Sequence, residues 1–138
     1  MKECESIIIV IPILDDWESL SLLLPKLDEA LNDERLAVDI PIVDDGSRVV
    51  FQEATFTPRN FKHINKISVL ELKRNVGHQR AIILGLAYIA AQCDCRAVLV
   101  VDGDGEEDPG DALRLIEKCR AEHFSKVILP AVRSALKG

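Results

Sequence analysis

Two acidic clusters follow apolar runs in this sequence. Asp102-Gly103-Asp104 comes directly after the run Ala97 to Val101, and Asp44-Asp45-Gly46-Ser47 follows the run Val38 to Val43. Short apolar runs of this kind are typical of buried strands. Because ligands of open α/β sheets bind beyond the carboxyl ends of the strands, both clusters are expected to face one cleft.

The chemistry expected of such a cleft is the binding of a phosphate-bearing ligand through a divalent cation. Carboxylate oxygens suit Mg²⁺ or Mn²⁺. Carboxylates alone repel phosphates, whereas a bound cation reverses the local charge. A calcium loop of the EF-hand type is excluded, because its twelfth position, counted from Asp102, is Leu113 in place of glutamate. A solvated turn remains the alternative for each cluster.

A third element is the basic, glycine-containing segment Lys73 to Ala81. It links a predicted strand to an apolar helical pattern, which places its cations at the same edge of the sheet as the acidic clusters. Arg74 could bind phosphate with two hydrogen bonds, and the first amides of the helix add positive potential. His78 is interpreted as a hydrogen-bonded structural residue, because no second histidine stands at ligand spacing.

The elements that must position these residues alternate between strands and helices. Strands are predicted at Ser6 to Ile13, Val38 to Val43, Ile67 to Leu72, Ala97 to Val101 and Lys126 to Leu129. The alternation predicts an α/β domain, an open three-layer α/β/α sandwich with a mostly parallel sheet. Residues 1–138 are expected to form this single domain, since the chain is too short for two comfortable cores.

Three helices are predicted between the strands. The first runs from Trp17 to Leu31, with Asp15 or Asp16 as N-cap and a kink at Pro25. The second, Gln79 to Gln92, is so apolar that burial on several sides is expected. The third, Asp111 to Glu122, has one apolar and one charged face. The segment Arg48 to Lys66 is interpreted as irregular.

Composition narrows the partners and the compartment. The chain is 48% hydrophobic and carries a net charge of -6, which argues against a general affinity for nucleic acid. No apolar run is long enough to span a bilayer. The four cysteines lack zinc-ribbon and redox C-x-x-C spacing, so a cytoplasmic location is expected.

Four ordered segments resemble the motifs of family 2 glycosyltransferases, above all of the dolichol-phosphate mannose synthase-like branch. They are Val10 to Asp16, Ile42 to Ser47, Leu72 to Gln79 and Val101 to Glu106. The resemblance covers nearly the whole chain. It implies a GT-A fold of the nucleotide-diphospho-sugar transferase type and a hexosyltransferase-like activity with a UDP-sugar or GDP-sugar as donor.

The resemblance also implies roles for individual residues. The base would be held by Asp45 and the loop that contains Pro12, Ile13, Asp15 and Asp16, with Asp44 supporting the strand end. Asp102 and Gly103 would lie near ribose and diphosphate, and Arg74 and Gly77 would line the donor pocket. Asp104 would be the principal ligand of Mg²⁺ or Mn²⁺, helped by Asp102 and Glu106, and the metal would neutralise the departing diphosphate.

The sequence departs from the family pattern in two ways. Asp15 stands where the family usually has asparagine, and Leu14 replaces an aromatic ring, which leaves the nucleotide undefined. The chain ends where the family enters its acceptor-binding half, so the catalytic base is unknown and expected beyond residue 138. A shortened donor-binding domain with little or no activity of its own is therefore predicted. Family likeness implies a polyprenyl-phosphate acceptor at the cytoplasmic membrane face for a full-length relative.

Two alternatives from other classes stay open at this point. A phospho-receiver domain also combines aspartates at strand ends, although its acidic pair should end the first strand, and a complete βα unit precedes Asp44 here. A non-catalytic interaction module is the other, and bare sheet edges could make it a homodimer.

Overall fold

The protein, represented by a computed structural model, is described over residues 5–33, 35–48, 61–92, 97–103 and 108–122. These residues form, in order, β1 (Glu5–Ile13), α1 (Trp17–Ala30), β2 (Leu36–Asp44), β3 (Ile64–Glu71), α2 (His78–Gln92), β4 (Ala97–Val100) and α3 (Gly110–Glu122). The predicted alternation of strands and helices is confirmed. The strand predicted at Lys126 to Leu129 lies outside the described residues.

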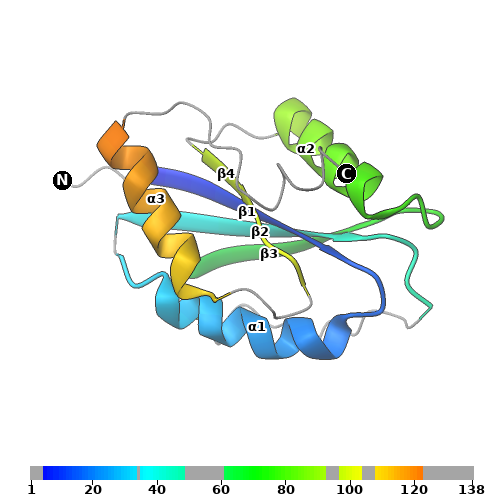
Figure 1. Ribbon diagram of the computed structural model, residues 1–138, viewed down its shortest axis with the longest axis horizontal. Coiled ribbons are helices and arrows are strands. Elements are labelled where there is room, and N and C mark those ends of the chain that lie inside the picture. The colour runs from blue at the N-terminus through cyan, green and yellow to red at the C-terminus, as the bar shows by residue number, and fades with distance from the viewer. Residues whose placement is uncertain (1–4, 34, 49–60, 93–96, 104–107, 123–138) are drawn as a thin grey trace.

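The four strands form one parallel sheet in the order β3-β2-β1-β4 (Figure 1). The chain builds outward from β1 through β2 to β3 and then returns to the other side of β1 to form β4. The strand order therefore reverses at β1, which makes the carboxyl end of β1 a topological switch point. A receiver domain has its third strand beside the first. The observed order excludes that alternative.

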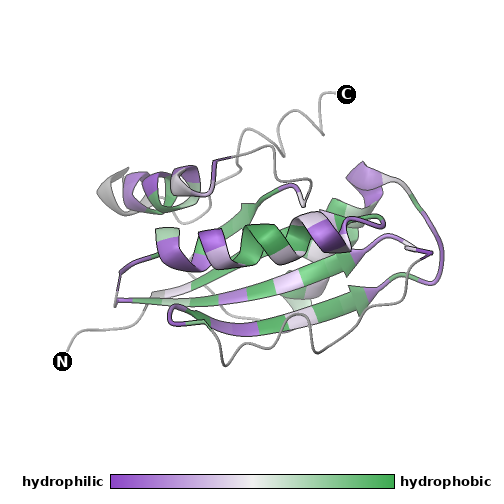
Figure 2. Ribbon diagram, turned by 90° about the horizontal axis from the view of Figure 1, so that it is seen from below, coloured by the Kyte–Doolittle hydropathy of each residue, from purple (hydrophilic) through white to green (hydrophobic). Residues whose placement is uncertain are grey.

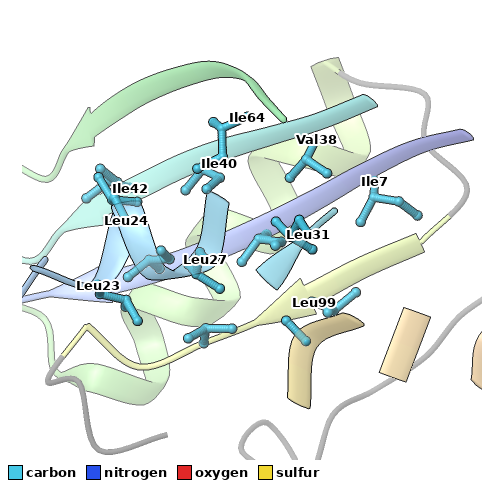
Figure 3. Packing of buried hydrophobic residues seen from close by; sticks show 14 of the residues in the cluster. Ile7, Leu23, Leu24, Leu27, Leu31, Val38, Ile40, Ile42, Ile64 and Leu99 are labelled. Atoms are coloured by element: carbon cyan, nitrogen blue, oxygen red, sulfur yellow. The ribbon is translucent and has the colours of Figure 1, made fainter. Parts of the chain in front are cut away.

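The larger part of the core lies between the sheet and the pair α1 and α3. Side chains alternate across a strand, so Ile7, Ile9, Ile11 and Ile13 all point to this face. Figure 3 shows strand residues meeting the leucines of α1 at close quarters. These leucines recur every three or four residues, at Leu20, Leu23, Leu24, Leu27 and Leu31. The α1 helix continues through Pro25.

The opposite face of the sheet is covered by α2 (Figure 1). Ala81, Ile82 and Ile89 pack here on Ile8 and Val10 and their neighbours in the sheet. The sandwich therefore has three layers, as predicted. Figure 2 shows that the strands are mostly hydrophobic, whereas the loops beyond their arrowheads are mostly hydrophilic.

Two expectations about these elements are wrong. The α2 helix is not buried on several sides, because Ile83, Leu84 and Tyr88 are exposed. Apolar composition alone could not distinguish burial by the sheet from burial by an additional layer. The segment Arg48 to Lys66 is not irregular throughout, since β3 begins at Ile64; its residues 49–60 lie outside the described part.

The start of β3 is determined by a buried carboxylate on α1. Asp28 accepts hydrogen bonds from the backbone N–H groups of Lys62, His63 and Ile64, at 2.9, 2.7 and 2.9 Å. Burial by itself raises the pKa of Asp28, but these three N–H groups and the charge of His63 together lower the pKa below its ordinary value. One helix residue thus anchors the strand through its backbone.

Within the described residues, none of the three helices is both long and apolar enough to cross a membrane.

Candidate functional site

A cavity of about 520 Å³ opens at the switch point of the sheet. It lies where β1, β2 and β4 end and α2 begins. Its lining combines carboxylates, backbone and apolar side chains: Pro12, Ile13, Leu14, Asp16, Asp45, Asn75, Gly77, His78, Ala81, Asp102 and Gly103. The two acidic clusters therefore face one shared cavity, as their positions in the sequence predict.

The opening between β1 and β4 is a consequence of Pro12. The C=O of Val10 accepts from the N–H of Val101, and the C=O of Ile13 accepts from Asp45 on the β2 side. Successive residues of β1 therefore bond in turn to β4 and to β2. After Val10, the next N–H directed at β4 would belong to residue 12. Proline has no N–H. The pairing of β1 with β4 ends at Val10, whereas that of β1 with β2 continues to Ile13.

Gly103 lies in the gap that this divergence leaves. A Cβ on residue 103 would be 2.5 Å from Cγ2 of Ile13 and 3.3 Å from the carbonyl oxygen of Pro12. Real Cβ atoms essentially never come as close to another atom as the first of these distances. Only glycine lets the chain after β4 pass so near to the end of β1, and this close approach keeps Asp102 at the cavity.

Asp45 connects the end of β2 to the loop before α2. Its backbone N–H donates to the C=O of Ile13 at 2.9 Å. Its two carboxylate oxygens accept from the N–H groups of Val76, at 2.7 Å, and Gly77, at 3.1 Å. Asp45 is only 4% exposed. The carboxylate thus organises the backbone at the cavity as well as lining it.

Two glycines make this connection possible. Gly77 has φ +98°, in the left-handed region that favours glycine, although a Cβ there would meet no atom within 4 Å. Gly46 has φ +78°, and a Cβ on it would be 2.6 Å from the backbone nitrogen of Asn75. The first glycine is required for its conformation, and the second for both conformation and space.

The loop after β1 is held by hydrogen bonds to the loop after β2. The N–H of Asp15 donates to Oγ of Ser47 at 2.8 Å, and the N–H of Arg48 donates to Oδ1 of Asp15 at 2.7 Å. Asp16 occupies the N-cap position of α1, as one of the two predicted candidates, but its side chain accepts from the N–H of Leu14 and makes no cap bond. The loop that carries Leu14 is therefore fixed from both sides.

Asp102 and His78 face each other across the cavity, from the end of β4 and the start of α2. Nε2 of His78 lies 3.1 Å from Oδ1 of Asp102, and the two side chains are 55% and 31% exposed. Oδ1 itself is buried, and apart from this contact with His78 it has no hydrogen-bond partner among the described residues. A buried carboxylate oxygen without a donor is a favourable position for a cation.

The predicted site residues fall into three groups. The first group lines the cavity and consists of Pro12, Ile13, Asp16, Asp45, Gly77, Asp102 and Gly103. Asp15, Asp44 and Arg74 lie beside it without lining it. Asp44 instead supports its strand end, because Oδ1 accepts from the N–H of Ser47 at 2.9 Å and its C=O accepts from Leu72. Asp104 and Glu106 lie outside the described residues.

Four lining residues were not predicted as ligand contacts: Leu14, Asn75, His78 and Ala81. His78, which was interpreted as a hydrogen-bonded structural residue, is exposed at the cavity and lies 3.1 Å from Asp102. Its position at the end of the basic, glycine-containing segment was the available signal. The described residues hold no group of three or more side chains that could bind a metal, and two of the three predicted metal ligands are outside that part.

Comparisons with known proteins give the family of the chain. Residues 8–135 match the family model described as Glycosyl transferase family 2. An uncharacterized glycosyltransferase of Bacillus subtilis (strain 168), YkcC, is 25% identical over 135 residues, which are 94% of this chain and 38% of that protein. An undecaprenyl-phosphate 4-deoxy-4-formamido-L-arabinose transferase of Pseudomonas fluorescens (strain SBW25) is 32% identical over 110 residues, or 80% of this chain and 31% of that protein. The chain spans about a third of the length of these relatives.

The fold is similar to that of a solved glycosyltransferase structure. Residues 1–349 of S. aureus TarS, which were also crystallised in complex with UDP, align with a TM-score of 0.59 and 22% sequence identity. The alignment covers 83% of this chain and 33% of the TarS chain. The expected GT-A fold is confirmed by this likeness. Together with the family match over most of its length, the four ordered motifs show that this chain belongs to glycosyl transferase family 2.

Proposed function

We propose that this chain is the donor-binding domain of a glycosyltransferase that uses a nucleotide-diphosphate sugar. One observation carries the proposal: Asp45, Asp102, Gly103 and the start of α2 line a single cavity at the switch point of the sheet. About 520 Å³ is within the usual range of small-molecule sites. The crystallised UDP complex of TarS supports a UDP-sugar as donor, and a GDP-sugar is the alternative.

Each end of the donor has a suitable part of the cavity. The base and ribose would lie against Pro12, Ile13 and Asp16, where Leu14 offers an apolar surface in place of an aromatic ring. The diphosphate would lie toward Gly77 and the start of α2. The first intrahelical hydrogen bond runs from the N–H of Ala81 to the C=O of Gly77, so the preceding amides have no partner within the helix. Such amides attract phosphate oxygens.

A divalent cation fits the acidic side of the cavity. Oδ1 of Asp102 is buried and, apart from the contact with His78, has no hydrogen-bond partner among the described residues, so a cation would satisfy it. We propose Asp102, Asp104 and Glu106 as the residues that hold Mg²⁺ or Mn²⁺. The ion would supply positive charge to the diphosphate as the glycosidic bond breaks.

The acceptor of the complete reaction is proposed to be a polyprenyl phosphate. The support for this is the likeness to the undecaprenyl-phosphate transferase, which the chain matches over 80% of its own length. An acceptor phosphate oxygen is already nucleophilic, so a transfer to it makes a smaller demand on a general base than a transfer to a hydroxyl.

Calorimetric titration with UDP-sugars and GDP-sugars, with and without Mn²⁺, tests the proposal. The expected result is binding that requires Mn²⁺ and weakens at least about tenfold in Asp102→Asn and Asp104→Ala, since charge-assisted contacts contribute more than about 1.4 kcal/mol. Glu117→Gln is the matched control, because Glu117 is an exposed carboxylate on α3. Binding that ignores the metal and both aspartate substitutions would remove the proposed site.

A further inference from the structure

The outward side of α2 is apolar. Ile83 is 50% exposed, Leu84 44% and Tyr88 45%, and Ala87 and Ala91 are exposed beside them. Positions 83, 84, 87 and 91 recur at the helical spacing of three and four residues and lie opposite the buried positions 81, 82, 85 and 89. We call these four outward positions with Tyr88 the α2 face. A helix in contact with water on this side would ordinarily carry polar residues there.

The segment from residue 72 to residue 92, which contains the α2 face, carries charges of one sign, although the exposed Glu71 directly precedes it. From residue 72 to residue 92 the chain has three cations, Lys73, Arg74 and Arg80, and no acidic residue, although the whole chain has 23 acidic and 17 basic residues. All three cations are exposed. The outward sides of α1 and α3 differ, since each contains exposed charges of both signs. The local excess of positive charge opposes the overall net charge of -6.

We propose that the α2 face lies on an anionic lipid bilayer, with its apolar side chains at the acyl boundary and the three cations among the headgroups. Interfacial helices bind by this combination of apolar area and basic residues. A two-fold contact between two copies through this face would bring their cations together, so the local charge favours an anionic lipid surface over a second copy. His78 and Ala81, which begin the same helix, line the cavity. Because Ala81 is on the opposite side of the helix from the α2 face, the cavity would lie about one helix diameter, roughly 10 Å, from the membrane surface. The proposal goes beyond donor binding and does not depend on it.

Vesicle sedimentation of the 138-residue chain tests the surface directly. Vesicles of phosphatidylcholine alone are compared with equimolar phosphatidylglycerol and phosphatidylcholine. We expect roughly hundredfold stronger binding to the anionic vesicles, because each of the three basic residues near the surface contributes a factor of about five. The double substitution Ile83→Glu with Leu84→Glu should abolish this binding. Leu22→Glu is the matched control, since Leu22 is 63% exposed on α1, across the sheet, and this variant should bind like the wild type.

A reporter variant keeps the test independent of the double substitution. A tryptophan placed by Leu84→Trp should shift its emission to shorter wavelength on anionic vesicles and be quenched by brominated acyl chains, whereas Leu22→Trp should show neither change. Equal vesicle binding by the wild type and the double variant, or no binding by either, would overturn the proposal.

Two further measurements distinguish lipid binding from self-association and from a loss of the folded structure. Sedimentation velocity without lipid tests for a second copy on the same surface. A wild-type dimer that the double substitution converts to a monomer would overturn the lipid assignment.

Calorimetry with the sugar nucleotide and Mn²⁺ checks that the double variant is folded. Ile83 and Leu84 do not line the cavity, so this variant should bind the donor like the wild type. Loss of donor binding in every variant, with vesicle binding intact, would count against the proposed function alone.

Discussion

Asp45 at the end of β2 accepts a hydrogen bond from the backbone N–H of Gly77, which is 32 residues further along the chain, at 3.1 Å. With the parallel bond from Val76, this contact fixes the loop that leads into α2. The position of the helix start relative to the sheet therefore depends on one carboxylate, and so does the shape of the cavity between them.

Asp45→Ala should destabilise the protein and weaken donor binding together. The substitution leaves two partly buried N–H groups without an acceptor, and we expect a loss of about 2–3 kcal/mol in the free energy of unfolding. Urea denaturation gives this value, and calorimetry gives the donor affinity. Asp39→Ala is the control, since among the described residues the side chain of Asp39 accepts one exposed hydrogen bond, from Nδ2 of Asn65 at 3.0 Å. Equal losses in the two variants would contradict the role of Asp45.

Gly77→Ala should lower the free energy of unfolding by about 1–2 kcal/mol, because an L-residue at φ +98° is strained. Space is not the reason, since a Cβ would meet no atom within 4 Å. Gly77→Asn should therefore lose less than Gly77→Ala, as asparagine tolerates positive φ better. Chemical denaturation of the three proteins decides between the two causes: identical losses for alanine and asparagine would contradict a conformational origin.

Gly103→Ala should also lower the free energy of unfolding, but through a steric clash with Ile13 and not through backbone strain. The added Cβ would lie 2.5 Å from Cγ2 of Ile13, and overpacking of this kind costs about 1–3 kcal/mol. Ile13→Leu removes the branch at the β-carbon, so the double variant should recover part of the loss. A double-mutant cycle measures the coupling between the two positions. Strictly additive effects would show that the clash is relieved elsewhere.

Asp28→Asn should change how stability depends on pH. Because the pKa of Asp28 is lowered in the folded state, its contribution is fully present above the pKa of the unfolded chain, about 4, and is lost as pH falls through the folded value. The wild type should therefore lose stability below about pH 4 more steeply than Asp28→Asn. Urea denaturation from neutral pH down to about pH 3 compares the slopes. Parallel curves would mean that the three N–H bonds to Asp28 do not govern its ionisation.

Much of the fold could be predicted because its determinants are local. The isoleucines of β1 and the leucines of α1 show their periods directly in the sequence, and they are the residues that meet in the core. The acidic clusters could be assigned to one edge because parallel strands end on one side. The start of β3 could not be predicted from the sequence, since it depends on Asp28, which is 36 residues before Ile64.

The details of the site were harder to predict for the same physical reason. A sequence pattern identifies Asp45 as a candidate ligand, but not that its oxygens accept the amides of Val76 and Gly77. Likewise His78 has no recognisable partner in the sequence, because Asp102 is brought opposite it only by the return of the chain across β1. Composition predicts burial for the outward side of α2. That prediction is wrong because hydrophobicity alone does not show whether another layer covers a helix.

The proline in β1 has a consequence for how this site can diversify. The separation of β1 from β4 at the cavity is a property of the backbone, because position 12 supplies no N–H to β4. Leu14 and Asn75 at the rim of the cavity can therefore be exchanged without closing this separation. The lining at positions 14 and 75 is therefore separate from the strand pairing, and these two positions can change at little risk to the sheet.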